Sequence, residues 1–203
     1  MVRSINKKMF KSLAYVLLII SALYVIATSG WIITSNRSII TVMELLTVWA
    51  AIVIVQFMLE LYRSSSENSK SQGLAALLYA VCMAVVTISN HFIYITVLTQ
   101  LYQKDNMPDY LLLDGWPSIS KGLECVSWGF FLGISMLYAS AVFREWESKA
   151  LVWIMRIFGI LTLAGLMGPV LNNMNFYMLS TIGYSLGFLV ISIELLVYFN
   201  KQK

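Results

Sequence analysis

Six apolar stretches, each long enough to cross a lipid bilayer as a helix, occupy most of this chain. A helix rises about 1.5 Å per residue and a hydrocarbon core is about 30 Å thick, so about 20 apolar residues make one crossing. The predicted spans are 13–34, 39–62, 74–102, 119–143, 150–171 and 178–200. Hydrophobic residues make up 59% of the chain and charged residues 12%, and no part has the composition of a separate soluble domain. We therefore expect one all-α domain over residues 1–203, a polytopic membrane protein with six transmembrane helices.

The apolar stretches do not fit a transmembrane β-barrel or a cleaved signal peptide. A barrel of transmembrane strands requires alternation of apolar and polar residues, whereas residues 15–20 are apolar throughout. The first stretch is longer than a signal-peptide core, and no clear small-residue cleavage site follows it. We expect this first span to be retained.

Basic residues are sorted between the two sides of the predicted bundle. Short connections rich in lysine and arginine stay on the cytoplasmic side of a membrane. One side holds Arg3, Lys7, Lys8, Lys11, Arg63, Lys70, Arg144, Lys149, Lys201 and Lys203, and the other holds Arg37, Lys104 and Lys121. The sequence therefore predicts a cell-membrane protein with both termini in the cytoplasm. A nucleic-acid partner is not expected, because the basic residues are spread over four short segments instead of forming one patch.

Polar residues in the outer half of the spans are the first candidates for a functional site. An ionisable group in hydrocarbon costs several kcal/mol unless it is paired, hydrated or neutral. Glu44, Asn90, His91 and Glu124 are expected at one level, with His91 and Glu124 on small or polar helix faces that point inward. A glutamate–histidine pair can carry a proton, so a ligand or proton site is one interpretation. A hydrogen-bonded structural cluster is the other.

A second polar level is predicted near the cytoplasmic ends of the spans. Arg156 and Glu194 each lie about six residues inside the end of consecutive, antiparallel spans. Glu194 also shares a face with Gly183 and Gly187 and should point into the bundle. We expect a structural Arg156–Glu194 ion pair, in preference to a transport role.

The remaining motifs concern packing and connections. Glycines four residues apart, at 129 and 133 and at 183 and 187, mark helix faces where backbones approach closely. Packing within the chain is the favoured interpretation of these faces, and an interface with a partner is the alternative. Segment 63–70 is expected to be a solvated linker. Segment 103–118, which mixes aspartates with aromatic residues, is expected to lie in the headgroup layer or to act as a lid.

The residue inventory argues against several chemistries. With one histidine, a single chain cannot ligate a haem through two histidines, and the two cysteines have no metal-ligand spacing. Neither a G-x-S-x-G elbow nor a nucleotide-binding glycine loop is present. No cofactor and no metal are therefore expected. A serine–histidine hydrolase using His91 stays open as a third hypothesis.

Several apolar motifs support a family resemblance. They are Glu44-Leu45-Leu46-Thr47, Leu61-Tyr62-Arg63, Trp128-Gly129-Phe130-Phe131-Leu132-Gly133, Leu137-Tyr138 and Gly159-Ile160-Leu161. With these motifs and the order of its spans, the chain resembles the bacterial membrane protein family called domain of unknown function 4386. The third span departs from the family, because Asn90 and His91 stand where the family has an arginine and a glutamate. The resemblance implies six helices and supplies no activity.

Two functional hypotheses follow from these observations. The first is a non-enzymatic membrane protein that binds or moves a small or lipidic molecule through Glu44, Asn90, His91 and Glu124. The second is a structural, immunity or sensory subunit that assembles with itself or with a membrane partner through its glycine faces.

Overall fold

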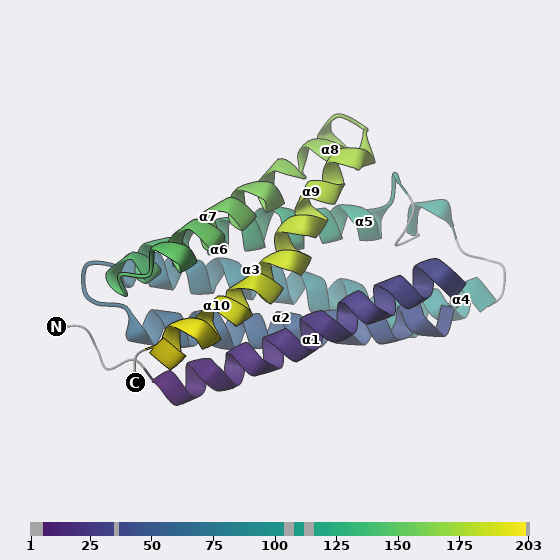
Figure 1. Cartoon of the computed structure of the whole chain (residues 1–203). Helices are drawn as coiled ribbons and strands as arrows, with labels where there is room; N and C mark the ends of the chain where they lie inside the picture. The colour runs from purple at the N-terminus through teal and green to yellow at the C-terminus, as the bar shows by residue number, and fades with distance from the viewer. Residues whose placement is uncertain (1–5, 35–36, 104–107, 112–115, 202–203) are drawn as a thin grey trace.

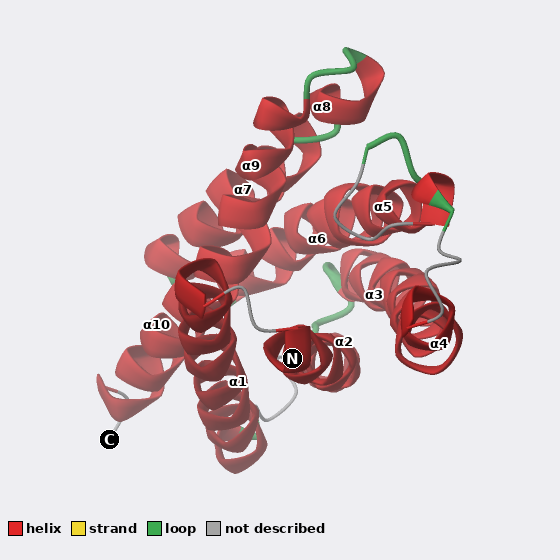
Figure 2. Ribbon diagram, turned by 90° about the vertical axis from the view of Figure 1, so that its right-hand side faces the viewer, coloured by secondary structure: helices red, strands yellow, loops and turns green. Residues whose placement is uncertain are grey.

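The computed structural model describes residues 6–34, 37–103, 108–111 and 116–201, and it is helical in all its regular elements (Figure 2). Six helices are long enough and apolar enough to cross a membrane. Their bounds are Lys7–Gly30, Ile39–Ser64, Lys70–Leu101, Ile119–Glu145, Lys149–Val170 and Met174–Lys201. The predicted all-α, six-span fold is confirmed, and the chain is a multi-pass integral membrane protein.

Several spans are built from more than one helical element. The first two spans are the single helices α1 (Lys7–Thr34) and α2 (Arg37–Ser64). The third consists of α3 (Lys70–Ile93), η1 (Tyr94–Leu98) and α4 (Thr99–Gln103), and the fourth of α5 (Ile119–Glu124), η3 (Cys125–Phe131) and α6 (Leu132–Glu145). The fifth consists of α7 (Lys149–Ala164) and α8 (Met167–Val170), and the sixth of α9 (Tyr177–Thr181), η5 (Ile182–Leu186) and α10 (Gly187–Lys201). The connections contain two short 3₁₀ turns, η2 (Asp109–Leu111) and η4 (Met174–Phe176).

The outer surface of the bundle is apolar. Trp49, Trp153 and Ile26 are each about 60% exposed or more, and many other large aliphatic side chains are exposed along the spans. Such a surface is unfavourable in water and favourable against lipid tails. Contact with a lipid bilayer follows from it.

The spans pack in chain order around a closed ring. Each contacts its neighbours in sequence, and α10 returns to pack against α1. Both ends of the described chain lie at one end of the bundle (Figure 1), which we call the terminal end. The opposite end, which carries α4, α5 and α8, is called the distal end.

Close helix contacts at glycine positions hold the second half of the ring together. A Cβ atom at Gly133 would lie 3.1 Å from the backbone oxygen of Gly159, and one at Gly183 would lie 2.8 Å from the backbone nitrogen of Thr162. Gly187 faces the ring of Phe158 in the same way. The glycine faces of spans four and six are therefore covered by span five of the same chain. Packing within the chain accounts for them, and they are not open to a partner.

Aromatic side chains close the terminal end. Phe10 of α1 packs edge-on against Phe57 of α2 and against Trp146, with ring centroids 5.9 and 5.0 Å apart. Phe143 and Phe199 complete this group, which we call the aromatic plug, and all five side chains are at most 6% exposed. Edge-to-face pairs of this kind are each worth about 0.5–1.5 kcal/mol beyond the area they bury.

The connection between α2 and α3 is held against α6 by one carboxylate. The Glu145 carboxylate accepts hydrogen bonds from the Ser66 hydroxyl at 2.6 Å, the Ser66 backbone N–H at 3.2 Å and the Ser69 hydroxyl at 2.6 Å. Ser64, Ser65 and Ser69 of this connection are buried, whereas Arg63, Glu67 and Asn68 are exposed. The expectation of a solvated linker at 63–70 is therefore wrong in part. The contact with Glu145 could not be inferred from the spacing, because Glu145 lies far along the chain.

We expect Glu145→Ala to lower the free energy of unfolding by about 2–3 kcal/mol. One hydrogen bond to a charged group contributes about 1.5–3 kcal/mol, and because Glu145 is half-buried, water compensates for part of the three bonds that are lost. Glu67→Ala is the matched control, because Glu67 lies on the same connection and is exposed. Thermal unfolding of the purified protein in detergent measures both. Equal stability of the two variants would contradict the anchoring role of Glu145.

The connection at 103–118 is described only in part, and residues 104–107 and 112–115 lie outside the described residues. In the described part, the Trp116 indole N–H donates to the Asn172 side-chain oxygen at 2.8 Å. This bond ties the connection before α5 to the turn after α8. Ser118 then begins α5, because its hydroxyl accepts the Lys121 backbone N–H at 3.0 Å as an N-cap.

Candidate ligand-binding site

Glu44 and His91 form a buried pair between α2 and α3 near the distal end. The Glu44 carboxylate contacts Nδ1 of His91, and the two residues are 5% and 2% exposed. The other ring nitrogen, Nε2, is buried and has no hydrogen-bond partner among the described residues. The structure therefore brings two of the four predicted site residues into direct contact and leaves one polar atom of the pair unsatisfied.

Asn90 has a different environment. Its side-chain N–H donates to the backbone oxygen of Ser120 at 3.1 Å, and the residue is 4% exposed. This bond joins the end of α3 to the start of α5. Asn90 thus contributes to positioning span four beside the pair, and its amide is already committed to a backbone partner.

Glu124 forms a second ion pair with Lys121, one turn earlier in span four. Lys121 Nζ lies 2.7 Å from the Glu124 carboxylate, and the two side chains are only 19% and 12% exposed. The same ammonium stands 4.5 Å from the centre of the Tyr177 ring. The hydroxyl of Tyr177 is buried and makes no hydrogen bond to the described residues. Lys121 is therefore held between a carboxylate and an aromatic face.

α1 and span six diverge toward the distal end (Figure 1). A cavity that both of them line adjoins Glu124. It offers water-sized molecules a volume of about 50 Å³, enough for roughly three to five waters. Four spans line it, through residues Leu17, Ile20, Ser21, Tyr24, Leu46, Thr47, Ala50, Ile54, Glu124, Trp128, Tyr184, Ser185 and Phe188. Ser21, Tyr24 and Ser185 are half-buried, so the cavity is not sealed from its surroundings.

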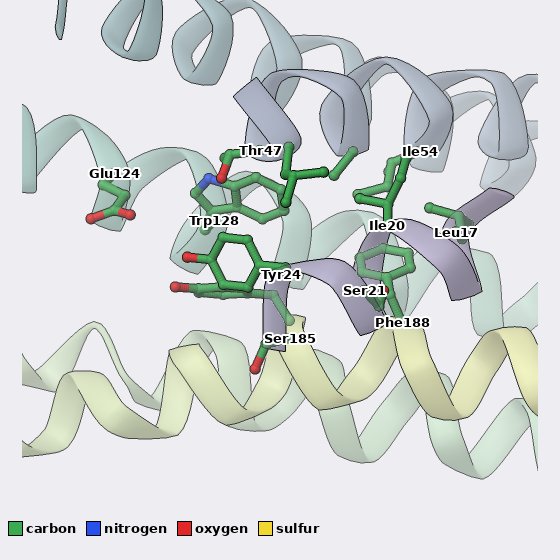
Figure 3. A pocket seen from close by; sticks show the side chains of 13 residues that line it. Leu17, Ile20, Ser21, Tyr24, Thr47, Ile54, Glu124, Trp128, Ser185 and Phe188 are labelled. Carbon is green, nitrogen blue, oxygen red and sulfur yellow. The ribbon is translucent and has the colours of Figure 1, made fainter. Parts of the chain in front are cut away.

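The lining changes from polar to apolar along the cavity. Figure 3 shows Glu124 at one end, Tyr24 and Trp128 next to it, and Ile54 and Phe188 at the other end. Thr47 lines the cavity and lies about one helical turn after Glu44 in α2. The buried Glu44–His91 pair is therefore close to the polar end of the cavity.

Two π-helical segments form part of the cavity wall. Trp128 lies in η3, and Tyr184 and Ser185 lie in η5. The rings of Trp128 and Tyr184 pack with their centroids 5.0 Å apart and tilted by 41°. A π-helical turn has an extra residue, which rotates the following side chains relative to an α-helix, and such turns are frequent at functional sites. Here they bring aromatic rings from spans four and six to the same wall.

The sequence did not predict Tyr24, Trp128 and Tyr184 as site residues. All three occur within apolar stretches, where an aromatic residue is ordinarily part of the packing or of the lipid face. The interruption of two neighbouring spans by π-helical turns has no recognised sequence signature. The glycines at 129 and 183, beside the relevant rings, were the available signal, and they were interpreted as packing positions.

The structure does not bring Arg156 and Glu194 together. Within the described residues the ion pairs join Arg63 to Glu60, His91 to Glu44 and Lys121 to Glu124. Arg156 instead donates to the Ser140 hydroxyl at 3.4 Å and lies 5.8 Å from the Trp153 ring centre. The expected Arg156–Glu194 ion pair is therefore not formed. The physical reason is that α7 and α10 meet at Gly183 and Gly187 and separate toward the terminal end (Figure 1).

The hydrolase hypothesis requires a serine hydroxyl bonded to the histidine ring. Among the described residues, Nδ1 of His91 is bonded to Glu44 and Nε2 is bonded to nothing. The serine–histidine arrangement is therefore not formed in the described part of the chain. No group of three or more histidine, cysteine, aspartate or glutamate side chains that could hold a metal ion occurs there either.

Comparison with protein-family models, with curated proteins and with solved structures finds no match to this chain.

Proposed function

We propose that this protein binds a small amphipathic molecule in the cavity between α1, α2, η3 and η5. The observation that carries the proposal is the gradient along the cavity, from the carboxylate of Glu124 through aromatic rings to the aliphatic side chains of Leu17 and Ile54. Ligand sites are mostly apolar cavities with a few polar groups at defined positions. A molecule with one polar head and one apolar chain matches such a lining.

The polar groups at this end have partners within the chain. Glu44 and Glu124 each have a cationic or imidazole partner, and Asn90 is bonded to the backbone. The head group would meet Glu124 and the Tyr24 hydroxyl, and the chain would follow the aliphatic wall. Its remaining length would extend between α1 and span six into lipid, because the side chains at this opening are half-buried.

Binding is better supported than movement across the membrane. The aromatic plug closes the terminal end with five side chains that are at most 6% exposed, whereas the cavity lies toward the distal end. A transport cycle would have to separate the rings of Phe10, Phe57 and Trp146, whose centroids lie 5.0–5.9 Å apart.

We further propose, from the distribution of basic residues, that the terminal end faces the cytoplasm of a cell membrane. We also propose, on the basis of its sequence motifs alone, that the chain belongs to the family called domain of unknown function 4386.

Photolabelling with a ten-carbon alcohol that carries a diazirine next to its hydroxyl tests the binding proposal. In phosphatidylcholine nanodiscs, we expect labelling that unlabelled decanol saturates. Ser21→Phe places a ring in the cavity and should lower this saturable labelling by about fivefold or more, equivalent to about 1 kcal/mol of affinity. Intact-protein mass spectrometry measures the labelled fraction.

Ala22→Phe is the matched control, because Ala22 is the next residue of α1 and is exposed on the lipid side. It should keep the labelling of the original protein. Equal labelling of the two phenylalanine variants, or no saturable labelling at all, would reject the cavity as the binding site.

A further inference from the structure

The polar end of the cavity combines aromatic faces with carboxylates. Tyr24, Trp128 and Tyr184 line the wall beside Glu124, and the Trp128 and Tyr184 rings are in contact. The ring faces of tryptophan and tyrosine carry negative electrostatic potential and attract cations, most strongly where water is excluded. The Glu124 carboxylate next to these rings is the one charged group that faces the cavity among the described residues, and its partner Lys121 lies outside the lining.

Lys121 already shows how this end accommodates a cation. Its ammonium lies 2.7 Å from the Glu124 carboxylate and 4.5 Å from the centre of the Tyr177 ring. It is held there although its side chain is only 19% exposed. An ammonium is thus stable at this level of the bundle when a carboxylate and an aromatic face surround it.

The charges near the cavity also disfavour an anion. Glu124 is the one charged side chain among the described lining residues, and its partner Lys121 is not one of them. An anionic head group in the cavity would therefore meet a carboxylate and no lysine or arginine of the described lining. Like charges repel strongly in a medium of low dielectric constant.

We infer that the ligand is a cationic amphiphile, a molecule with an ammonium head group and an apolar chain. This inference rests on the proposed function and names the chemical class of its ligand. The head group lies between Glu124 and the rings of Tyr24 and Trp128, and the chain lies along Leu17, Ile54 and Phe188. A quaternary ammonium fits this environment because it needs no hydrogen-bond acceptor, only negative potential around it.

Three competitors with the same ten-carbon chain test the inference in the photolabelling assay. They are decyltrimethylammonium, decanol and decyl sulfate, and phosphatidylcholine nanodiscs keep the bilayer free of net charge. We expect the cation to block labelling at a concentration about tenfold below that of decanol, which corresponds to one carboxylate contact at low exposure. Decyl sulfate should be the weakest competitor.

Glu124→Gln identifies the residue responsible. It should remove the advantage of the cation over decanol, which is about tenfold in the unmodified protein, so that the two compounds compete at similar concentrations. Saturable labelling of the variant shows that the cavity is intact. Glu194→Gln is the control, because this half-buried glutamate lies outside the cavity. If Glu124→Gln does not fold, Trp128→Leu takes its place, with lipid-exposed Trp49→Leu as its control.

The possible outcomes separate the two proposals. Equal competition by the three compounds, or preference for decyl sulfate, overturns the inference while saturable labelling keeps the proposed function. Retention of cation preference in both Glu124→Gln and Trp128→Leu also overturns the inference. Absence of saturable labelling in the unmodified protein overturns both.

Discussion

Replacing Gly183 by alanine should lower the free energy of unfolding by about 2–3 kcal/mol, as overpacking of a rigid core position does. The added Cβ would lie 2.8 Å from the Thr162 backbone nitrogen and 2.9 Å from the Phe158 backbone oxygen. Both atoms belong to the backbone of α7, so neither can move aside as a flexible side chain would. The variant must separate span six from span five, and span six also lines the cavity.

Gly122→Ala is the matched substitution for this test. Gly122 also lies in a helix near the distal end, but its Cβ would meet no atom within 4 Å. Here alanine should be neutral or stabilising by up to about 1 kcal/mol, because it has the higher helix propensity. The unfolding temperature in detergent should therefore fall for Gly183→Ala and stay the same or rise for Gly122→Ala. Similar unfolding temperatures would contradict the close contact between spans five and six.

Separating the buried pair should have a still larger effect. Glu44→Leu or His91→Leu should each lower the free energy of unfolding by about 3–5 kcal/mol, because the remaining partner is left buried without its counterpart. The pair contacts directly and both residues are at most 5% exposed. We expect the larger loss for Glu44→Leu. This variant removes the partner of Nδ1 of His91, whose Nε2 already lacks a hydrogen-bond partner among the described residues.

The double variant Glu44→Leu with His91→Leu supplies the control. Two apolar side chains of similar size leave no unpaired polar group in this buried site. The free energy of unfolding of the double variant should therefore lie within about 2 kcal/mol of that of the original protein. Unfolding by sodium dodecyl sulfate, followed by circular dichroism, gives the four free energies of this cycle. Additive losses in the double variant would show that Glu44 and His91 act independently.

The features predicted well from the sequence depend on composition and local spacing. Six apolar stretches of bilayer length specify six helices, because in hydrocarbon the backbone must satisfy its own hydrogen bonds. Glycines spaced by four correctly marked the faces where spans four and six meet span five. The level of Glu44 and His91 followed from counting residues from the span ends, and the structure places the two side chains in contact.

The features that sequence could not supply depend on how the helices turn relative to one another. Two π-helical segments rotate Trp128 and Tyr184 toward each other, and the pattern of apolar residues does not predict such turns. The divergence of α7 from α10 keeps Arg156 and Glu194 apart, although their depths agree. Glu145 reaches the serines of the α2–α3 connection through a contact between residues 76 or more apart in the chain.

The most direct test of the cavity as a binding site is the position of the photolabel in the chain. After labelling with the diazirine alcohol in phosphatidylcholine nanodiscs, peptide mass spectrometry identifies the modified residues. We predict that the saturable label is found on Tyr24, Tyr184 and Glu124, which line the polar end of the cavity. A saturable label confined to lipid-exposed positions such as Trp49 and Trp153 would contradict binding in the cavity.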